Sequence, residues 1–187
     1  MRQIAKYLDA DWERLRTLAG LPHQRRRLTN CFSPRFAPVA LVRLAQVLYA
    51  NGWTRLAKVP AFLNFVIFGL EVPASLAIEG GLVLMHTQGT ILGAAKIGAD
   101  VTIYQQVTLG ARTADFSYRI ELRPIVENGV TITAGAKVLG ALTLGTGCTV
   151  GANAVVLSDV PAHSLAVGVP ARIIHGRTND QDAQEIP

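Results

Sequence analysis

Two residues with catalytic potential flank an apolar stretch of the sequence. Glu71 opens the segment EVPASLAIEGGLVLMHTQG (71–89), and His86 lies near its end. A histidine with an ordinary pKa near 6.5 can accept a proton at neutral pH, and a carboxylate on its second nitrogen can fix its tautomer. On residue type alone, a histidine in an apolar run is more often structural, and a glutamate at a domain entry is often a cap. Their roles therefore depend on the architecture that carries them.

The dominant pattern in the sequence is a repeat of six residues. Aliphatic residues recur every six positions in three blocks, with a step of seven after Leu84 and a step of seventeen after Leu109. A second series of small or apolar residues lies two positions before the first. The first series is Val72, Ile78, Leu84, Ile91, Ile97, Ile103, Leu109, Val126, Ile132, Val138, Leu144, Val150 and Val156, and the second is Ala95, Val101, Val107, Val130, Ala136, Leu142, Cys148 and Ala154.

This period predicts a parallel β-helix. Each unit forms a short strand and a corner, and coils spaced about 4.8 Å apart stack their apolar residues into one core. Residues two apart on a strand share a face, which accounts for the second series, whereas a globular helix does not repeat at six. The step of seven places one extra residue near His86, and the longer step makes 110–125 a loop that leaves the solenoid, where function often lies.

The sequence before the solenoid is helical in pattern. Ile4, Leu8, Trp12 and Leu15 fit one helix face, and the helix expected over 37–52 stops at an Asn-Gly pair. Pro60 is expected to kink or divide the following segment. We therefore predict a helical region at 1–70, a β-helix domain at 71–176 with its loop at 110–125, and a polar tail at 177–187.

Composition places the chain among globular proteins. It has 187 residues, is 50% hydrophobic and contains two cysteines, too few for a disulfide framework. The charged start has no apolar core like that of a signal peptide, so a cytoplasmic location is expected. No nucleic-acid motif accompanies the net charge of +5.

The positive charge belongs to the first third of the chain. Residues 1–60 hold 11 Lys and Arg against 3 Asp and Glu. One interpretation is a solvated helical face with a basic loop at 25–27; the other is attraction to anionic lipid or glycan. The apolar run at 59–70 favours peripheral membrane contact, although it is too short to span a bilayer.

Three motifs connect the repeat to a known superfamily. The segments VGANAVVLSDVPAHSLAVGVPARII (150–174), QQVTLG (105–110) and ITAGAKVLGALTLG (132–145) resemble the hexapeptide-repeat acyltransferases, and most closely their serine O-acetyltransferase branch. The resemblance covers about residues 71–176. It implies a mainly β fold, a left-handed parallel β-helix preceded by a short α-helical region.

The resemblance also implies an enzyme and a catalytic pair. Members of the branch use a histidine as general base, oriented by a carboxylate fifteen residues upstream, which corresponds to His86 and Glu71. The implied reaction is direct transfer of acetyl from acetyl-CoA to an alcohol within a ternary complex. In the family, the donor lies between neighbouring β-helices against backbone groups at small residues, which suggests Gly110, Ala134 and Ala152.

Other positions are assigned by their place in these motifs. The resemblance puts Arg172 near the mouth of the donor groove as a phosphate partner. The small residues at 110, 134 and 152 are equally explained by packing at corners. His163 lies in a common turn and is expected to be structural, while His23 and His175 are peripheral.

The predicted acceptor follows from the positions where the sequence departs from the serine enzymes. Met85 stands where they have an aspartate, Leu122 and Arg123 replace an Arg-His pair, and the helical region is about half the usual length. The short helical region, Glu71 in place of the usual aspartate and the basic apolar segment before the solenoid resemble exopolysaccharide O-acetyltransferases of the colanic acid kind. Together with the lost ionic partners for an amino acid, they favour a sugar hydroxyl as acceptor. Arg123 either binds an anionic sugar or phosphate or is a solvated loop residue. Serine is the alternative acceptor.

Two other classes of protein share this solenoid. A metalloenzyme of the carbonic anhydrase type needs three converging histidines, which the spacing of His86, His163 and His175 does not favour, so no metal is expected. A non-catalytic scaffold would bind no coenzyme A. The family resemblance further implies a homotrimer with active sites between subunits.

Overall fold

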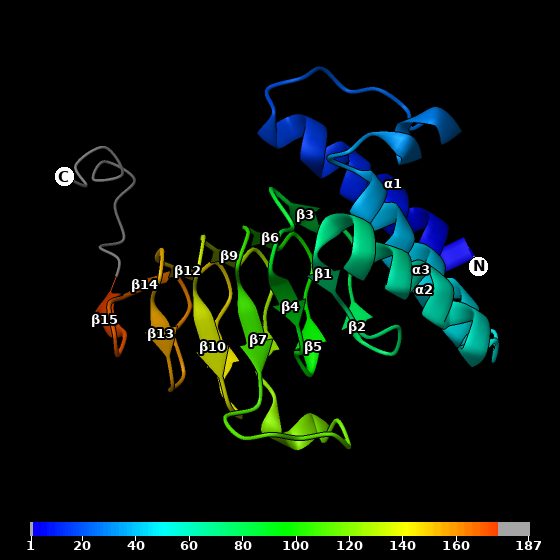
Figure 1. The fold of residues 1–187 in the computed structure, drawn as a ribbon. Coiled ribbons are helices and arrows are strands. Elements are labelled where there is room, and N and C mark those ends of the chain that lie inside the picture. The colour runs from blue at the N-terminus through cyan, green and yellow to red at the C-terminus, as the bar shows by residue number, and fades with distance from the viewer. Residues whose placement is uncertain (1, 176–187) are drawn as a thin grey trace.

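The hexapeptide units fold into short strands separated by corners. The computed structural model describes residues 2–175, so the predicted tail at 177–187 lies outside the described residues. Figure 1 shows the solenoid with the helices gathered at one end. The strands are β1 (Leu70–Glu71), β2 (Ala77–Ile78), β3 (Val83–Leu84), β4 (Thr90–Leu92), β5 (Lys96–Ile97), β6 (Thr102–Ile103), β7 (Thr108–Gly110), β8 (Ile125–Val126), β9 (Thr131–Ile132), β10 (Lys137–Leu139), β11 (Thr143–Leu144), β12 (Thr149–Val150), β13 (Val155–Val156), β14 (Ser164–Val167) and β15 (Arg172–His175).

From β1 to β13, each strand pairs with the strand three places further along the chain, which gives the solenoid three faces. Face A has the order β1-β4-β7-β10-β13, face B the order β2-β5-β8-β11, and face C the order β3-β6-β9-β12-β14-β15. The pairs are parallel except for β14 with β15, which is antiparallel. A parallel β-helix is therefore the observed architecture of residues 70–175, and its strands, of two to four residues, are shorter than those of most globular proteins.

The interior of the solenoid is formed by the two predicted series of apolar residues, with one correction. Twelve of the thirteen residues in the first series are buried, but Ile91 is 40% exposed and Leu92 is fully buried. Strand β4 pairs Ile91 with Glu71, and Leu92 with the interior residue Leu109. The corner around His86 is therefore two residues longer than a regular unit, not one.

The next corner compensates for this shift. From Leu92 to Ile97 the step is five, so the corner after β4 is one residue shorter than the repeat. Ala94 is fully buried there, while Ala95, the predicted member of the second series, is only half-buried. Beyond Ile97 the six-residue register holds as predicted up to the loop at 110–125.

Three α-helices form a layer over the N-terminal end of the solenoid (Figure 1). Trp12 of the first helix and Phe36 pack edge to face with ring centroids 5.2 Å apart, and both belong to the solenoid's core cluster. Pro60 lies within the third helix without dividing it. The helices are α1 (Arg2–Leu18), α2 (Ala37–Ala50) and α3 (Thr54–Phe68), with single 3-10 turns η1 (Leu28–Phe32) and η2 (Ile120–Leu122).

Candidate active site

The corners that lead from face C to face A form one continuous edge of the solenoid. Backbone hydrogen bonds join successive corners along it, from Gln106 N to Gln88 O (3.0 Å), from Gly135 N to Gln105 O (2.9 Å) and from Asn153 N to Ala134 O (2.9 Å). We call residues 85–89, 104–106, 133–135 and 151–153 the C–A edge. His86 lies at its N-terminal end.

The corner that carries His86 is fixed on both sides. The Met85 amide donates to Ile103 O (3.0 Å), which continues the face C ladder. The Thr87 hydroxyl donates to Phe68 O at the end of α3 (2.8 Å). His86 itself is exposed between these two anchors. The longer corner therefore lifts the imidazole out of the solenoid while the backbone beside it stays in place.

His86 lines a pocket of about 130 Å³ between the solenoid and the end of α1. Met85 lines the same pocket, and its role in binding the acceptor stays a prediction. The remaining wall is apolar apart from one arginine, and none of its described residues is acidic. The lining residues are Leu15, Leu18, Ala19, Arg35, Leu84, Met85 and His86.

Arg35 is the site residue that sequence reasoning missed. It lies two residues before the start of α2 and contributes the only cationic side chain, other than a protonated imidazole, to the described lining of the pocket. Its side chain is exposed, and none of the ion pairs found across residues 2–175 includes it. A guanidinium of this kind is suited to a carboxylate or phosphate.

Glu71 lies on face A, one coil before Ile91. Its neighbours Leu70 and Val72 point into the core, so its own exposed side chain points outward. The Gly89 amide donates a hydrogen bond to Gly69 O (3.0 Å), which places the start of β1 next to the His86 corner. Within residues 2–175 no ion pair joins the Glu71 carboxylate to His86, so the predicted dyad is not assembled in this structure.

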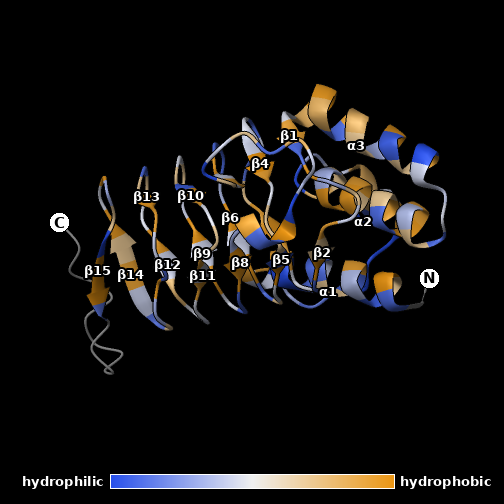
Figure 2. Cartoon of the chain, turned by 90° about the horizontal axis from the view of Figure 1, so that it is seen from below, coloured by the Kyte–Doolittle hydropathy of each residue, from blue (hydrophilic) through white to orange (hydrophobic). Residues whose placement is uncertain are grey.

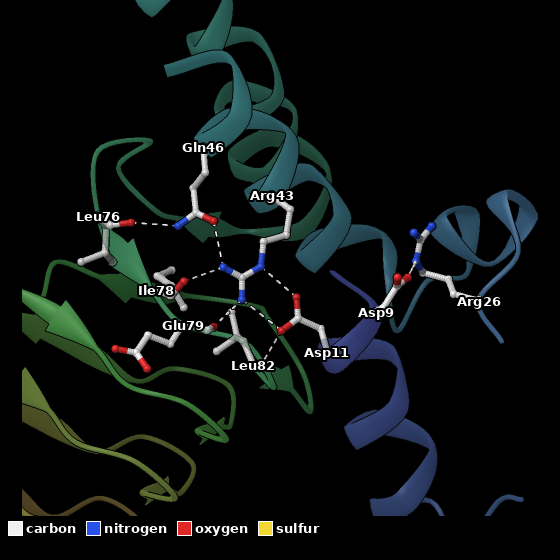
Figure 3. A network of polar contacts seen from close by, with 9 residues as sticks. All are labelled: Asp9, Asp11, Arg26, Arg43, Gln46, Leu76, Ile78, Glu79 and Leu82. Atoms are coloured by element: carbon white, nitrogen blue, oxygen red, sulfur yellow. Dashed lines mark hydrogen bonds and ion pairs between the residues drawn. The ribbon is translucent and has the colours of Figure 1, made fainter. Parts of the chain in front are cut away.

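A buried ion pair holds the helical layer against the coil that leads to His86. Arg43 of α2 donates to both carboxylate oxygens of Asp11 of α1, through Nε at 2.8 Å and Nη2 at 3.0 Å (Figure 3). Asp11 also accepts the Leu82 amide (2.8 Å) immediately before β3. Burial raises the pKa of the Asp11 carboxyl, and the hydrogen bonds from Arg43 oppose that rise.

The same guanidinium also binds the backbone of the solenoid. Arg43 donates to Ile78 O (2.7 Å) and Glu79 O (2.6 Å), and Gln46 donates to Leu76 O (2.8 Å), as Figure 3 shows. The corner between β2 and β3 is thereby tied to α1 and α2 together. This connection positions the end of α1 over His86 and so shapes the pocket.

The residues predicted to hold the donor fall into two groups. Ala134 and Ala152 lie on the C–A edge with His86, two and three corners further along. Gly110 is the last residue of β7 and lies on the opposite side of face A from the C–A edge. Its carbonyl oxygen accepts a hydrogen bond from the Gly140 amide of the next coil (2.8 Å). A Cβ at Gly110 would meet no atom within 4 Å, so the surface beside it is open. A single chain therefore does not bring all three residues together.

Arg172 lies at the C-terminal end of the C–A edge. It begins β15, is exposed, and pairs in register with Val167 of β14. The preceding turn joins face A through Ala171 N to Val155 O (2.8 Å). With coils about 4.8 Å apart, the edge offers an extended path from Arg172 to His86. A long, flexible donor with an anionic end fits such a path.

The remaining histidines lie away from the pocket. His163 occupies a corner with a φ of 55°, and its amide donates to Thr146 O (2.9 Å). His23 pairs with Glu13 at 2.7 Å on the surface, and His175 ends β15. Across residues 2–175 there is no group of three or more His, Cys, Asp or Glu side chains that could hold a metal ion.

The loop at 110–125 engages Arg123 internally. Arg123 is buried, and its Nη2 donates to the Asp115 carboxylate (2.9 Å) while its Nη1 donates to Gly93 O (3.1 Å). The guanidinium also lies 3.6 Å from the centroid of the Tyr118 ring. Arg123 is thus neither the solvated residue nor the free cation that the sequence suggested, since its charge already has a partner.

Asp115 is the centre of this loop. Burial would raise the pKa of its carboxyl, but hydrogen bonds from Ser117, from the Arg119 amide and from Arg123 outweigh that effect and lower the pKa to about 2. The carboxylate therefore stays ionised across the physiological range. It holds the loop in one conformation through hydrogen bonds within the loop itself.

Comparison with known proteins identifies the class of this fold and site. No family model matches the chain. Over 133 residues it is 41% identical to the serine acetyltransferase of Helicobacter pylori strain J99, a match that covers 71% of this chain and 76% of that protein. The crystal structure of Neisseria gonorrhoeae serine acetyltransferase in complex with serine aligns with a TM-score of 0.79 at 28% identity, covering 92% of this chain and 69% of the other.

A further structural match concerns the donor. A serine acetyltransferase in complex with CoA aligns with a TM-score of 0.70 at 27% identity and covers 92% of this chain and 70% of the other. These matches confirm the left-handed parallel β-helix and define an acetyl-CoA-dependent acyltransferase with acetyl-CoA as its donor. The chain belongs to the serine acetyltransferase family. The predicted superfamily and branch are confirmed, whereas the likeness to exopolysaccharide enzymes finds no support among these relatives.

Proposed function

We propose that this acetyltransferase transfers the acetyl group of acetyl-CoA to the hydroxyl of serine. The match to three quarters of the Helicobacter pylori serine acetyltransferase carries the proposal. The pocket at His86 supports it, because a base, an uncommitted guanidinium and a small volume suit a short hydroxy acid. Serine replaces the sugar that the sequence favoured as first candidate.

His86 is the proposed general base. The donor supplies a thioester whose carbonyl carbon is open to attack by an alcohol. His86 accepts the hydroxyl proton as the acceptor oxygen attacks and returns that proton to the departing thiolate, so protons and charge balance. No cysteine lines the pocket, and burial raises the pKa of the Cys148 thiol to about 11. Direct transfer without an acyl-enzyme fits these side chains.

Glu71 is the proposed orienting residue for His86. Its carboxylate is exposed and in no ion pair within the described part of the chain, which leaves it available to the imidazole. A carboxylate on the second ring nitrogen would fix the tautomer and stabilise the protonated ring. A movement of the Glu71 side chain or of the His86 corner would form this contact once the site is filled.

We propose that the donor lies along the C–A edge. Its thioester end would reach His86, its pantetheine arm would follow the corners at Ala134 and Ala152, and its phosphates would meet Arg172. Gly110 lies on a different edge, so a groove that uses it together with Ala134 needs a second copy of the chain. This arrangement supports the homotrimer implied by the family, and light scattering should give three times the 20.0 kDa of one chain.

Arg35 is the proposed partner of the acceptor carboxylate. A charge-assisted hydrogen bond of this kind contributes about 1.5–3 kcal/mol, so Arg35→Gln should raise KM for serine about 10- to 100-fold with a smaller effect on kcat. Arg25→Gln, at an exposed arginine outside the pocket, is the matched control and should leave KM unchanged. Serinamide, which lacks the carboxylate, should not distinguish wild type from Arg35→Gln.

A saccharide remains the second candidate acceptor because of one observation. The described lining of the pocket contains no carboxylate to bind an ammonium group, and Met85 is apolar. An acceptor panel of serine, 3-hydroxypropionate and hexoses separates the two candidates. Turnover of serine alone supports the proposal, and turnover of hexoses without serine overturns it. A non-catalytic scaffold would instead show neither turnover nor coenzyme A binding.

A further inference from the structure

The outer face of α3 is apolar and exposed. We define this face by six residues whose side chains are each more than half exposed, at values from 55% to 64%. Figure 2 shows α3 at the rim of the helical layer, hydrophobic along most of its length and hydrophilic near its start. The six residues are Leu56, Val59, Phe62, Phe65, Val66 and Ile67.

The helix exposes most of its large apolar side chains, and the residues that it buries are small or polar. Its buried residues are Ala57, Pro60 and Asn64, and the Asn64 amide donates to Pro38 O (3.0 Å). A surface helix of a soluble protein normally buries its large apolar residues and exposes its polar ones. Two large phenylalanines on one exposed helix face indicate a surface that meets an apolar partner.

An apolar groove extends this surface. It has a volume of about 690 Å³ and is lined by α1, η1, α2 and α3. Leu63 and Ile67 of α3 form one wall, and Leu8 of α1 and Phe32 of η1 lie on others. The exposed apolar area is therefore broader than a single helix face.

The segment that includes α2 and α3 carries charge of one sign. Between Glu13 and Glu71 the sequence contains nine Lys and Arg residues and no Asp or Glu. Two of these cations, Arg55 and Lys58, are exposed on α3 itself. Two copies of the chain that met through parallel α3 helices would bring these cations together, whereas an anionic surface would attract them.

We propose that α3 docks in the plane of an anionic lipid bilayer. Its outer face would insert at the boundary between headgroups and acyl chains, with Arg55 and Lys58 at the lipid phosphates. No helix within residues 2–175 is long and apolar enough to cross a membrane, and the 15 residues of α3 fall short of the roughly 20 that a span requires. The contact is therefore peripheral and is independent of the acceptor.

Co-sedimentation of the full chain with vesicles tests this proposal. Vesicles of phosphatidylcholine mixed with phosphatidylglycerol should bind the protein, and vesicles of phosphatidylcholine alone should bind it far less. Salt at about 1 M shortens the Debye length to about 3 Å and should release it. Arg55→Gln with Lys58→Gln should lower partition more than tenfold, since each cation contributes about fivefold near such a surface.

Matched variants distinguish the apolar face from general hydrophobicity. Phe65→Asp should lower partition by about tenfold or more, whereas Val169→Asp, at an apolar residue that is 72% exposed at the opposite end of the solenoid, should not. Circular dichroism and acetyl transfer in solution should be unchanged in Phe65→Asp. Equal binding by wild type and Phe65→Asp overturns the proposal. A lower oligomer mass for Phe65→Asp would also overturn it, since α3 would then bind a second copy.

Discussion

The solenoid and the helical layer place their apolar side chains in opposite ways. In the solenoid, interior residues such as Leu109 and Ile132 are fully buried, and each coil covers the next. In α3, Phe62 and Phe65 are more than half exposed, while Asn64 is buried. The solenoid therefore buries its apolar core within one chain, whereas the outer face of α3 is left exposed for the proposed partner surface to cover. Stability should reside in the first region and association in the second.

The largest effect on the free energy of unfolding is expected where the helical layer meets the solenoid. Asp11→Ala leaves the Arg43 guanidinium buried without its carboxylate and should destabilise the fold by about 3–5 kcal/mol. Urea denaturation measures this loss. Asp11→Leu combined with Arg43→Met should recover much of it, because an apolar pair of similar volume has no buried charge to solvate. A loss below about 1 kcal/mol for Asp11→Ala would show that the helices dock without this network.

The second prediction compares how truncation of one side chain in each region changes the free energy of unfolding. Leu109→Ala removes a side chain from the solenoid interior and should cost about 2–5 kcal/mol. Phe62→Ala removes a larger side chain from the outer face of α3, yet should change the free energy of unfolding by no more than about 0.5 kcal/mol. Equal losses in the two variants would mean that α3 is packed in the folded protein and would remove the contrast.

A third pair of variants tests the register at the His86 corner. Leu92→Ala should cost about 2–5 kcal/mol because Leu92 is fully buried. Ile91→Ala should cost much less, since Ile91 is 40% exposed beside Glu71. The six-residue pattern read without the structure predicts the reverse order. Thermal unfolding of the two variants side by side decides between the registers.

The smallest effect concerns the loop at 110–125 and depends on pH. The pKa of Asp115 is lowered to about 2 from 3.8, so its stabilisation is complete above about pH 4 and is lost as the pH falls through the folded pKa. Asp115→Asn should therefore destabilise the protein at neutral pH, and the difference from wild type should shrink between pH 3.8 and about 2. A difference that persists at pH 2 would contradict this account.

Much of the fold followed from the sequence because the repeat is strict. Buried positions recur every six residues, and a solenoid has no other way to stack them. The register failed at Ile91 and Leu92, and with them at Ala95 of the second series. Ile91 and Leu92 are adjacent aliphatic residues between which a six-residue count cannot choose. Corner lengths decide that choice, and they depend on how His86 and its neighbours leave the coil.

The candidate site was only partly accessible to sequence analysis. His86 and Met85 lie next to each other in a recognisable motif, so both could be placed in one pocket. Arg35 lies in a turn before a helix, far from His86 in the sequence, and only the docking of the helical layer brings it to the pocket. Arg123 was misjudged because its partner, Asp115, belongs to a loop with no repeat to predict its contacts.

The most direct test of the central claim is release of free thiol from acetyl-CoA in the presence of serine. Wild type should release thiol, and His86→Asn should lower kcat by about 10²- to 10⁴-fold, the usual contribution of a general base. His163→Asn, at a histidine in a solenoid corner, is the matched control and should retain wild-type activity. Full activity in His86→Asn would contradict the assignment of His86, and no thiol release by wild type with serine would contradict the proposed acceptor.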